Sequence, residues 1–193
     1  MKEDTVYQFT AENGLEVRLR PMRASDGPHL VDIFEHMSSE SRYARFNVSL
    51  SDPDPDWVAQ QAAQLAFLPP NEGKAWLAFA DLPQEPDAPI GGIRYVVVEL
   101  RVAEVSLVVR DDLQGLGIGT ELMRFAGRAA YADGLCTLLG YVQSDNRAMW
   151  QTLERLGVPC RRTLEGTHTI IEVDLREAEP YWNADKTDGS AQK

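Results

Sequence analysis

The chain has 193 residues, of which 44% are hydrophobic and 25% charged, a composition typical of one globular domain. This composition excludes collagen-like, coiled-coil and wholly disordered chains, and no apolar run reaches the roughly 18 residues that a membrane span needs. The net charge of −11 repels a phosphate backbone and argues against nucleic-acid binding. At the N-terminus no apolar stretch follows the charged residues, so we expect a cytoplasmic protein that binds neither nucleic acid nor membrane.

Alternating and periodic apolar residues predict the elements of the first half. The segment 15–20 alternates apolar and charged residues, as a half-buried strand does. Leu30, Ile33, Phe34 and Met37 then fall on one helical stripe. The half is completed by a proline-flanked helix (57–67), a strand (74–80) and a long β-branched strand (90–99).

The sequence of the second half predicts a strand that pairs antiparallel with the strand 90–99, followed by alternating helices and strands. These are a strand (104–109), a helix (118–133), a strand (135–141), a helix (146–156) and two strands (160–164 and 168–174). The order βααβββαβαββ predicts an α/β fold, a mixed, mostly antiparallel sheet with helices on both faces. We divide the chain into an N-terminal extension (1–14), one domain (15–175) and a polar C-terminal tail (176–193).

Cysteine and histidine positions indicate no metal centre. Cys136 and Cys160 lack the spacing of a disulfide framework or a zinc site. His29, His36 and His168 share no spacing that indicates a triad or a ligand set. We therefore expect no metal, and the sequence leaves both a monomer and a homodimer open.

Three alternating glycines follow the predicted strand 104–109 and open the next helix. Such a loop, residues 114–120 and here called the glycine loop, lets the backbone approach a bulky anion closely, and the free N–H groups of the helix attract phosphate. A Walker loop needs a lysine that the segment lacks. A dinucleotide fingerprint needs a glycine where Thr120 stands, and too few strand units remain after it.

A third kind of loop fits these residues. The run VVRDDLQGLGIGT resembles the acyl-CoA pyrophosphate loop of the GNAT acyltransferase superfamily, and SDNRAMWQTLERLG resembles its asparagine-bearing helix. With MSSESRYARF and VAEVSLVVRDDLQG, the chain is most similar to the acetyltransferase domain of Pat-type protein lysine acetyltransferases. The resemblance spans about residues 15–174 and implies acetyl-CoA as co-substrate.

The resemblance also implies which residues bind the co-substrate. The main chain of Leu107 and Val109 should pair with the pantetheine amides, the glycine loop should surround the pyrophosphate, and Asn146 should contact the pantetheine arm. A tight strand-to-helix turn without a ligand is the alternative interpretation of any one glycine. The full candidate set is Leu107, Val108, Val109, Gln114, Gly115, Leu116, Gly117, Ile118, Gly119, Thr120, Asn146 and Met149.

Acetyl transfer to an amine needs a base, because a lysine-like ammonium has a reference pKa near 10.4. Strand alternation places Glu104 on the same face as Ser106 and Val108, and in the resemblance this acid aligns with the general base. The structural alternative is a carboxylate paired with Arg94 or Arg101. Leu153 stands where many GNAT enzymes have a tyrosine that protonates the leaving thiolate, so no general acid carries over.

The acceptor side is less defined. Tyr43, Arg45 and Phe46 lie between the first two predicted helices, which in this fold border the acceptor site, although surface packing explains them equally well. Residues 52–104 hold nine acidic and three basic residues, a net charge of −6, which is either a solvated face or a mouth that attracts cations.

The resulting hypothesis is an acetyl-CoA-dependent N-acetyltransferase that acts by direct attack in a ternary complex. Its acceptor would be a protein lysine or another cationic amine. The alternatives are an enzyme for small molecules (an amino acid, a polyamine or an antibiotic) and a CoA-binding module without catalysis.

Overall fold

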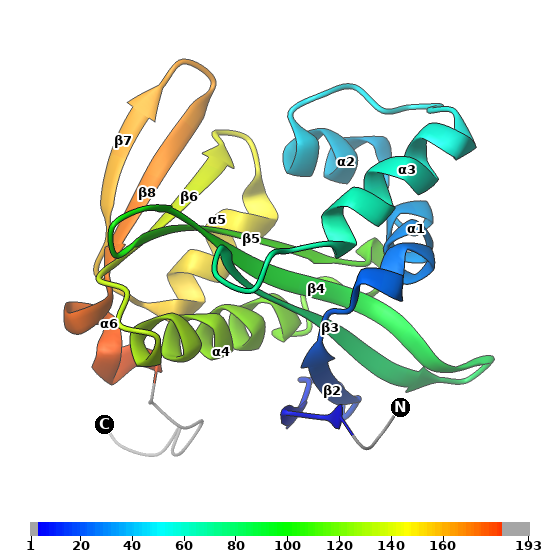
Figure 1. Ribbon diagram of the computed structural model, residues 1–193, viewed down its shortest axis with the longest axis horizontal. Coiled ribbons are helices and arrows are strands. Elements are labelled where there is room, and N and C mark those ends of the chain that lie inside the picture. The colour runs from blue at the N-terminus through cyan, green and yellow to red at the C-terminus, as the bar shows by residue number, and fades with distance from the viewer. Residues whose placement is uncertain (1–3, 183–193) are drawn as a thin grey trace, which may run out of the picture.

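The computed structural model describes residues 4–182 and contains an eight-stranded sheet with the strand order β1-β2-β3-β4-β5-β6-β8-β7 (Figure 1). All neighbours are antiparallel except β5 and β6, which α4 joins as a parallel pair. The strands are β1 (Tyr7–Thr10), β2 (Glu16–Pro21), β3 (Gly73–Leu82), β4 (Glu85–Glu99), β5 (Val102–Val109), β6 (Thr137–Gln143), β7 (Arg161–Glu165) and β8 (His168–Asp174).

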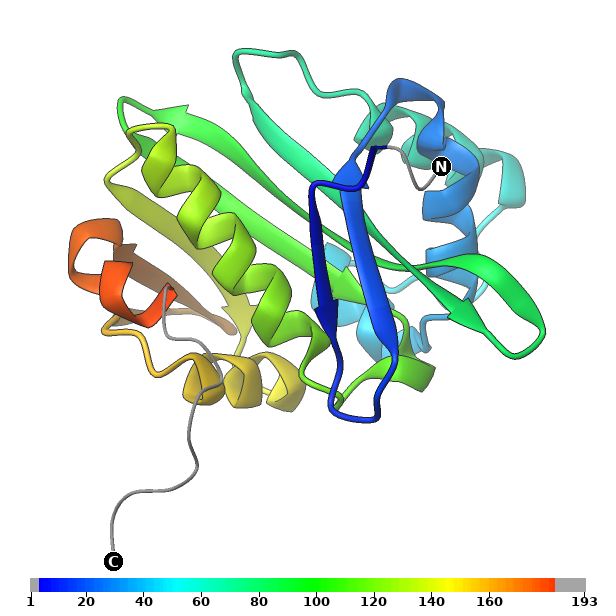
Figure 2. The same ribbon diagram turned by 90° about the horizontal axis from the view of Figure 1, so that it is seen from below.

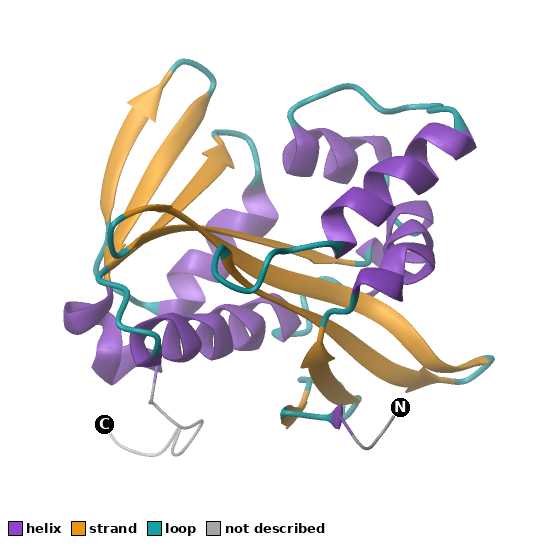
Figure 3. Cartoon of the chain, viewed as in Figure 1, coloured by secondary structure: helices purple, strands orange, loops and turns teal. Residues whose placement is uncertain are grey.

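Helices cover both faces of the sheet (Figures 1 and 3). One face carries α1 (Gly27–Glu35), α2 (Ser39–Phe46) and α3 (Pro55–Ala66). The other carries α4 (Ile118–Ala132), α5 (Arg147–Leu156) and α6 (Leu175–Trp182), which Figure 2 shows lying together against the strands. The expected α/β fold with a mostly antiparallel sheet is confirmed.

The core follows from the helical periodicity of α4. Ile118, Leu122, Ala126 and Ala130 recur at intervals of four residues, and all four are buried against the sheet. On the opposite face of the sheet, one smaller cluster joins α1 to β3 and another joins α1 to α3. The helix α4 is therefore the element around which the main core forms, and its first residue, Ile118, is buried in that core.

The structure differs from the expected organisation at both ends of the domain. The expected extension 1–14 contains β1, whose Tyr7 and Phe9 pack against the main core while the strand pairs with β2. The expected tail 176–193 begins inside α6, and Trp182 is only 1% exposed. A Cβ on Gly127 would lie 2.7 Å from the Trp182 ring, so the glycine of α4 makes room for it. Residues 183–193 of the expected tail lie outside the described part of the chain.

Both differences have a physical reason. A strand of four residues carries too little alternation to be recognised, and α6 is a short helix with Pro180 inside it, although its apolar residues recur on one face. The structure also adds α2, which has no buried residue and therefore no apolar stripe to reveal it. Its Ser38 cap and the left-handed Asn47 at its end define it instead.

Candidate functional site

The parallel strands β5 and β6 separate after three paired positions. The last recorded pair in residues 4–182 joins Glu104 and Leu139; beyond it β5 pairs with β4 and β6 with β8. A cleft of about 410 Å³ lies along this separation, and it is lined by residues of β5, β6, α2, α5 and the start of α4. Peptide groups along the facing edges are therefore open to a ligand that adds to the sheet like a strand.

The glycine loop closes one end of the cleft. Gly115 and Gly117 have φ angles of +78° and +77°, in the left-handed region that favours glycine. Gly117 is the N-cap of α4 and has no side chain to cap it, so the first N–H groups of a 15-residue helix remain available. The backbone geometry therefore fits an anion at this helix terminus.

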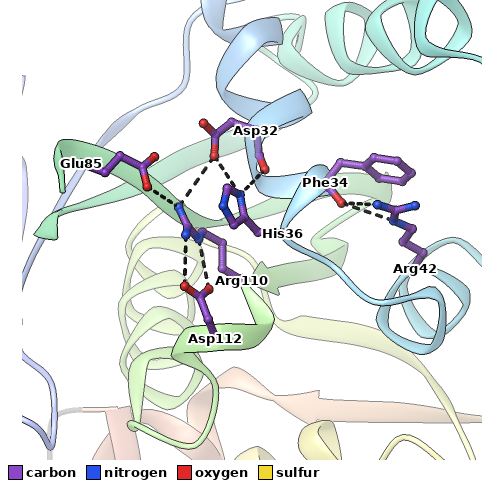
Figure 4. Close-up of polar contacts among 7 residues, drawn as sticks. All are labelled: Asp32, Phe34, His36, Arg42, Glu85, Arg110 and Asp112. Atoms are coloured by element: carbon purple, nitrogen blue, oxygen red, sulfur yellow. Dashed lines mark hydrogen bonds and ion pairs between the residues drawn. The ribbon is translucent and has the colours of Figure 1, made fainter. Parts of the chain in front are cut away.

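A buried arginine fixes the chain just before the glycine loop (Figure 4). The Arg110 side chain is 4% exposed, and its guanidinium donates to both carboxylate oxygens of Asp112 (3.1 and 3.0 Å) and to Glu85 (3.0 Å). Burial lowers the pKa of Arg110, but these hydrogen bonds outweigh it and raise the pKa above its ordinary value. Nearby, Asp111 accepts a hydrogen bond from the Ser38 backbone at 2.9 Å, which ties the loop to the turn between α1 and α2.

The Gln114 side chain holds the end of β5. Its Nε2 donates to the Val109 carbonyl (3.2 Å) and to Asp111 Oδ1 (2.9 Å). The Val109 carbonyl therefore already has a partner within the protein. Leu107 packs toward the main core and Val108 toward α1 and α3, so their side chains leave β5 on opposite faces.

Asn146 has a structural role in addition to its place in the cleft. It is the N-cap of α5, and its Oδ1 accepts a hydrogen bond from the Met149 backbone at 3.0 Å. Both residues line the cleft. Leu153 of the same helix is buried in the main core and also lines the cleft, and its side chain carries no proton to donate.

Glu104 lies where β5 and β6 begin to separate, and its side chain is exposed in the cleft. Arg45 of α2 lines the same space and donates to Ser106 Oγ at 3.1 Å, while Arg94 pairs in register with Ser106. Burial lowers the pKa of Arg45 and the charge of Arg94 lowers it further, whereas the Glu104 charge acts in the opposite direction. Within residues 4–182 no ion pair within 4.0 Å joins Glu104 to Arg94 or Arg101, although the Glu104 charge partly offsets the burial that lowers the pKa of Arg94.

The structure brings most of the predicted site residues together. All the candidate cofactor residues line the cleft except Leu116, which packs against the main core and accepts a backbone hydrogen bond from Glu12. On the acceptor side Arg45 and Phe46 line the cleft, whereas Tyr43 is 40% exposed outside it.

Sequence reasoning missed many residues that line the cleft, and two of them make polar contacts between distant segments. Gln143, at the end of β6, donates from Nε2 to Asn47 Oδ1 and so joins β6 to α2. Arg155, in the last turn of α5, lies beside the glycine loop. Each contact joins segments far apart in the chain, and no local pattern could have revealed it.

The acidic stretch 52–104 does not surround the cleft. Of its nine acids, only Glu104 is among the described residues that line the cleft. Asp81 and Asp87 bind Arg18, and Glu85 binds Arg110. Arg45 and Arg155 add positive charge to the cleft walls, so the lining is not strongly acidic.

Residues 4–182 contain no group of three or more histidine, cysteine or acidic side chains placed to hold a metal ion. None of the helices in that range combines the length and the hydropathy needed to cross a bilayer.

Solved structures share this fold. The GNAT domain of PAT from S. lividans aligns with a TM-score of 0.70 at 22% identity, over 87% of this chain and 96% of that one. A cAMP-binding acyltransferase from Mycobacterium smegmatis aligns with a TM-score of 0.56 at 24% identity, over 92% of this chain but 55% of its own length. The PaiA N-acetyltransferase from Thermoplasma acidophilum, solved in complex with coenzyme A, gives 0.58 at 17% identity, over 82% and 98% of the two chains.

The family assignment comes from a sequence comparison. A family model described as the acetyltransferase (GNAT) domain matches residues 16–159, which is more than half of the chain. This range contains Glu104, the glycine loop and Asn146, and it agrees with the resemblance found in the sequence. The chain therefore belongs to the GNAT acetyltransferase family.

Proposed function

We propose that the protein transfers an acetyl group from acetyl-CoA to a primary amine by direct attack in a ternary complex. The observation that carries the proposal is the separation of β5 from β6, which has the glycine loop at one end and Glu104 at the other. The α4 N-terminus suits the pyrophosphate, and the open strand edges suit the amides of the pantetheine arm. The thioester then lies near Glu104.

The chain's own residues account for the proton transfer. Glu104 accepts a proton from the acceptor amine, whose nitrogen forms the new C–N bond as the C–S bond breaks. The sulfur leaves as a thiolate, and its ordinary pKa near 8.5 makes this tolerable without a donor in the position of Leu153. Glu104 is exposed to the cleft, so it can pass the proton on to water.

Two classes of acceptor remain candidates. A protein lysine or another cationic amine agrees with the sequence resemblance and with the carboxylate of Glu104. An amine that also carries a carboxylate, such as an amino acid, is favoured by the Arg45 guanidinium, which lines the cleft on the same face of β5 as Glu104.

The test is incubation of the protein with acetyl-CoA and a panel of amines and lysine-containing proteins, with thiol release as the readout. Matched pairs such as lysine and cadaverine, which differ by one carboxylate, separate the two acceptor classes. Amine-dependent thiol release supports the proposal. CoA binding without turnover on any amine would contradict it and would identify a binding module.

A further inference from the structure

The turn between β1 and β2 places an acidic side chain on the glycine loop. The backbone N–H of Glu12 donates to the Leu116 carbonyl at 3.1 Å. Its Oε1 lies 3.0 Å from the position that a Cβ would have on Gly117, the N-cap of α4. The protein's own carboxylate therefore lies beside the helix terminus where we place the phosphates of the co-substrate.

Arg155 reaches the same point from α5. Its Nη1 lies 3.1 Å from Glu12 Oε1 and 3.5 Å from the Gly115 carbonyl oxygen. The side chain is 45% exposed and lines the cleft, and that of Glu12 is 50% exposed. One cation and one anion thus face each other over the glycine loop, on segments 143 residues apart in the sequence.

An arriving phosphate changes the balance of this pair. It is repelled by the Glu12 carboxylate and attracted by the Arg155 guanidinium, whose several N–H donors match the geometry of phosphate oxygens. We propose that Arg155 binds a phosphate group of CoA, and that Glu12 is an internal anion that competes with this phosphate for Arg155. The identity of the ligand rests on the proposed function.

The pair also has a simpler explanation, in which Arg155 only neutralises Glu12. Both explanations predict that CoA binding weakens when Arg155 alone is changed. They differ when Glu12 has already been neutralised, because Arg155 then has no carboxylate left to screen. Half-exposed ion pairs contribute little to stability, so changes at either position should leave the protein folded.

The experiment measures the Kd of CoA by calorimetry for the wild type, Glu12→Gln, Arg155→Gln and the double variant. We expect Glu12→Gln to bind CoA about threefold more tightly, because this variant has lost the carboxylate that competes with the phosphate for Arg155. In the Glu12→Gln background, Arg155→Gln should still weaken binding by about tenfold, the value of one charge-assisted hydrogen bond. An unchanged Kd in that background would overturn the proposal.

Matched controls carry the same charge changes elsewhere. Glu16→Gln on β2 alters an exposed acid that accepts hydrogen bonds from Thr10 and Gln8, and Arg161→Gln on β7 alters an arginine that is 80% exposed. Both should leave the Kd of CoA within about twofold, since long-range effects are screened at physiological salt. A shift in these controls as large as in the test variants would attribute the effect to net charge and overturn the proposal.

A comparison of CoA with dephospho-CoA identifies which phosphate Arg155 binds. If Arg155→Gln no longer weakens binding of dephospho-CoA, the partner is the 3′-phosphate; if it still does, the partner is the pyrophosphate. Arg155→Lys keeps the charge and should retain most of the affinity, and thermal melting checks that each variant is folded. A wild-type chain that binds no CoA at all would instead overturn the proposed function, and this inference with it.

Discussion

The two ends of the cleft are held by the protein in different ways. At the glycine loop, buried Arg110, the Gln114 side chain and the core residues of α4 fix the backbone. At the acceptor end, α2 has no buried residue and is held by the partly buried Phe46 and by polar contacts such as those of Arg42 with the Phe34 carbonyl. The part that would bind a constant co-substrate is therefore fixed by buried contacts, whereas the part facing the acceptor can vary at little cost to the fold.

The largest effect is expected at Glu104, at the end of the cleft opposite the glycine loop. General-base assistance is worth roughly 10² to 10⁴ in rate, so Glu104→Gln should lower kcat by about that factor while the Kd of acetyl-CoA stays unchanged. The residual rate should rise with pH, because more of the acceptor amine is then neutral without help. Steady-state rates as a function of pH test this.

A purely structural carboxylate predicts the opposite pattern for Glu104→Gln. The melting temperature would fall, and turnover per folded molecule would stay near that of the wild type. Melting temperature and rate are therefore measured on the same preparation.

A substitution in the glycine loop should remove CoA binding without touching the acceptor end. Gly117→Val forces a β-branched residue into a left-handed φ of +77° beside Glu12, and it places a side chain against the phosphates. We expect the Kd of CoA to rise by about 100-fold or more, which corresponds to about 3 kcal/mol of lost contact with the phosphates. Calorimetry measures the change.

Gly134→Val is the matched control. Gly134 has a similar φ of +78°, but it follows the far end of α4 and has no atom within 4 Å of its Cβ position. Its variant should lose stability through the same backbone strain and still bind CoA normally. Equal loss of binding in both variants would count against a site at the glycine loop.

Arg110 tests whether the rigid end depends on its buried charge. Arg110→Gln leaves Asp112 and Glu85 without their shared partner and should lower the free energy of unfolding by about 1 to 3 kcal/mol. Urea unfolding measures the loss. A variant as stable as the wild type would show that the network does not hold the loop.

Tyr43 should give the smallest effect. It is exposed on α2 outside the cleft, so Tyr43→Ala should change the free energy of unfolding by no more than about 0.5 kcal/mol. The Kd of CoA should also remain unchanged in calorimetry. A marked fall in the free energy of unfolding, or a marked rise in the Kd of CoA, would mean that α2 is held as firmly as the glycine loop.

Local patterns account for what could be predicted from the sequence. The alternation of β5, the periodicity of α4 and the three glycines between them each lie within a short window, so they identified the fold and the part of the cleft lining that β5 and the glycine loop supply. The exposed helix α2 has no apolar stripe, and the alternation of β1 spans only four residues.

Contacts between distant segments could not be predicted. The pairs Glu12–Arg155 and Asn47–Gln143 exist only because the sheet brings together turns and helix ends far apart in the chain. The same reason explains why the acidic stretch 52–104 does not line the entrance of the cleft. In the folded chain Asp81 and Asp87 pair with Arg18, and Glu85 pairs with Arg110.

A crystal structure with CoA bound decides whether acetyl-CoA occupies the cleft between β5 and β6. We expect the pyrophosphate on the backbone N–H groups of the glycine loop, the pantetheine arm along β5, and the sulfur near Glu104. CoA bound elsewhere, or in this cleft with its sulfur pointing away from Glu104, would rule out the proposed site.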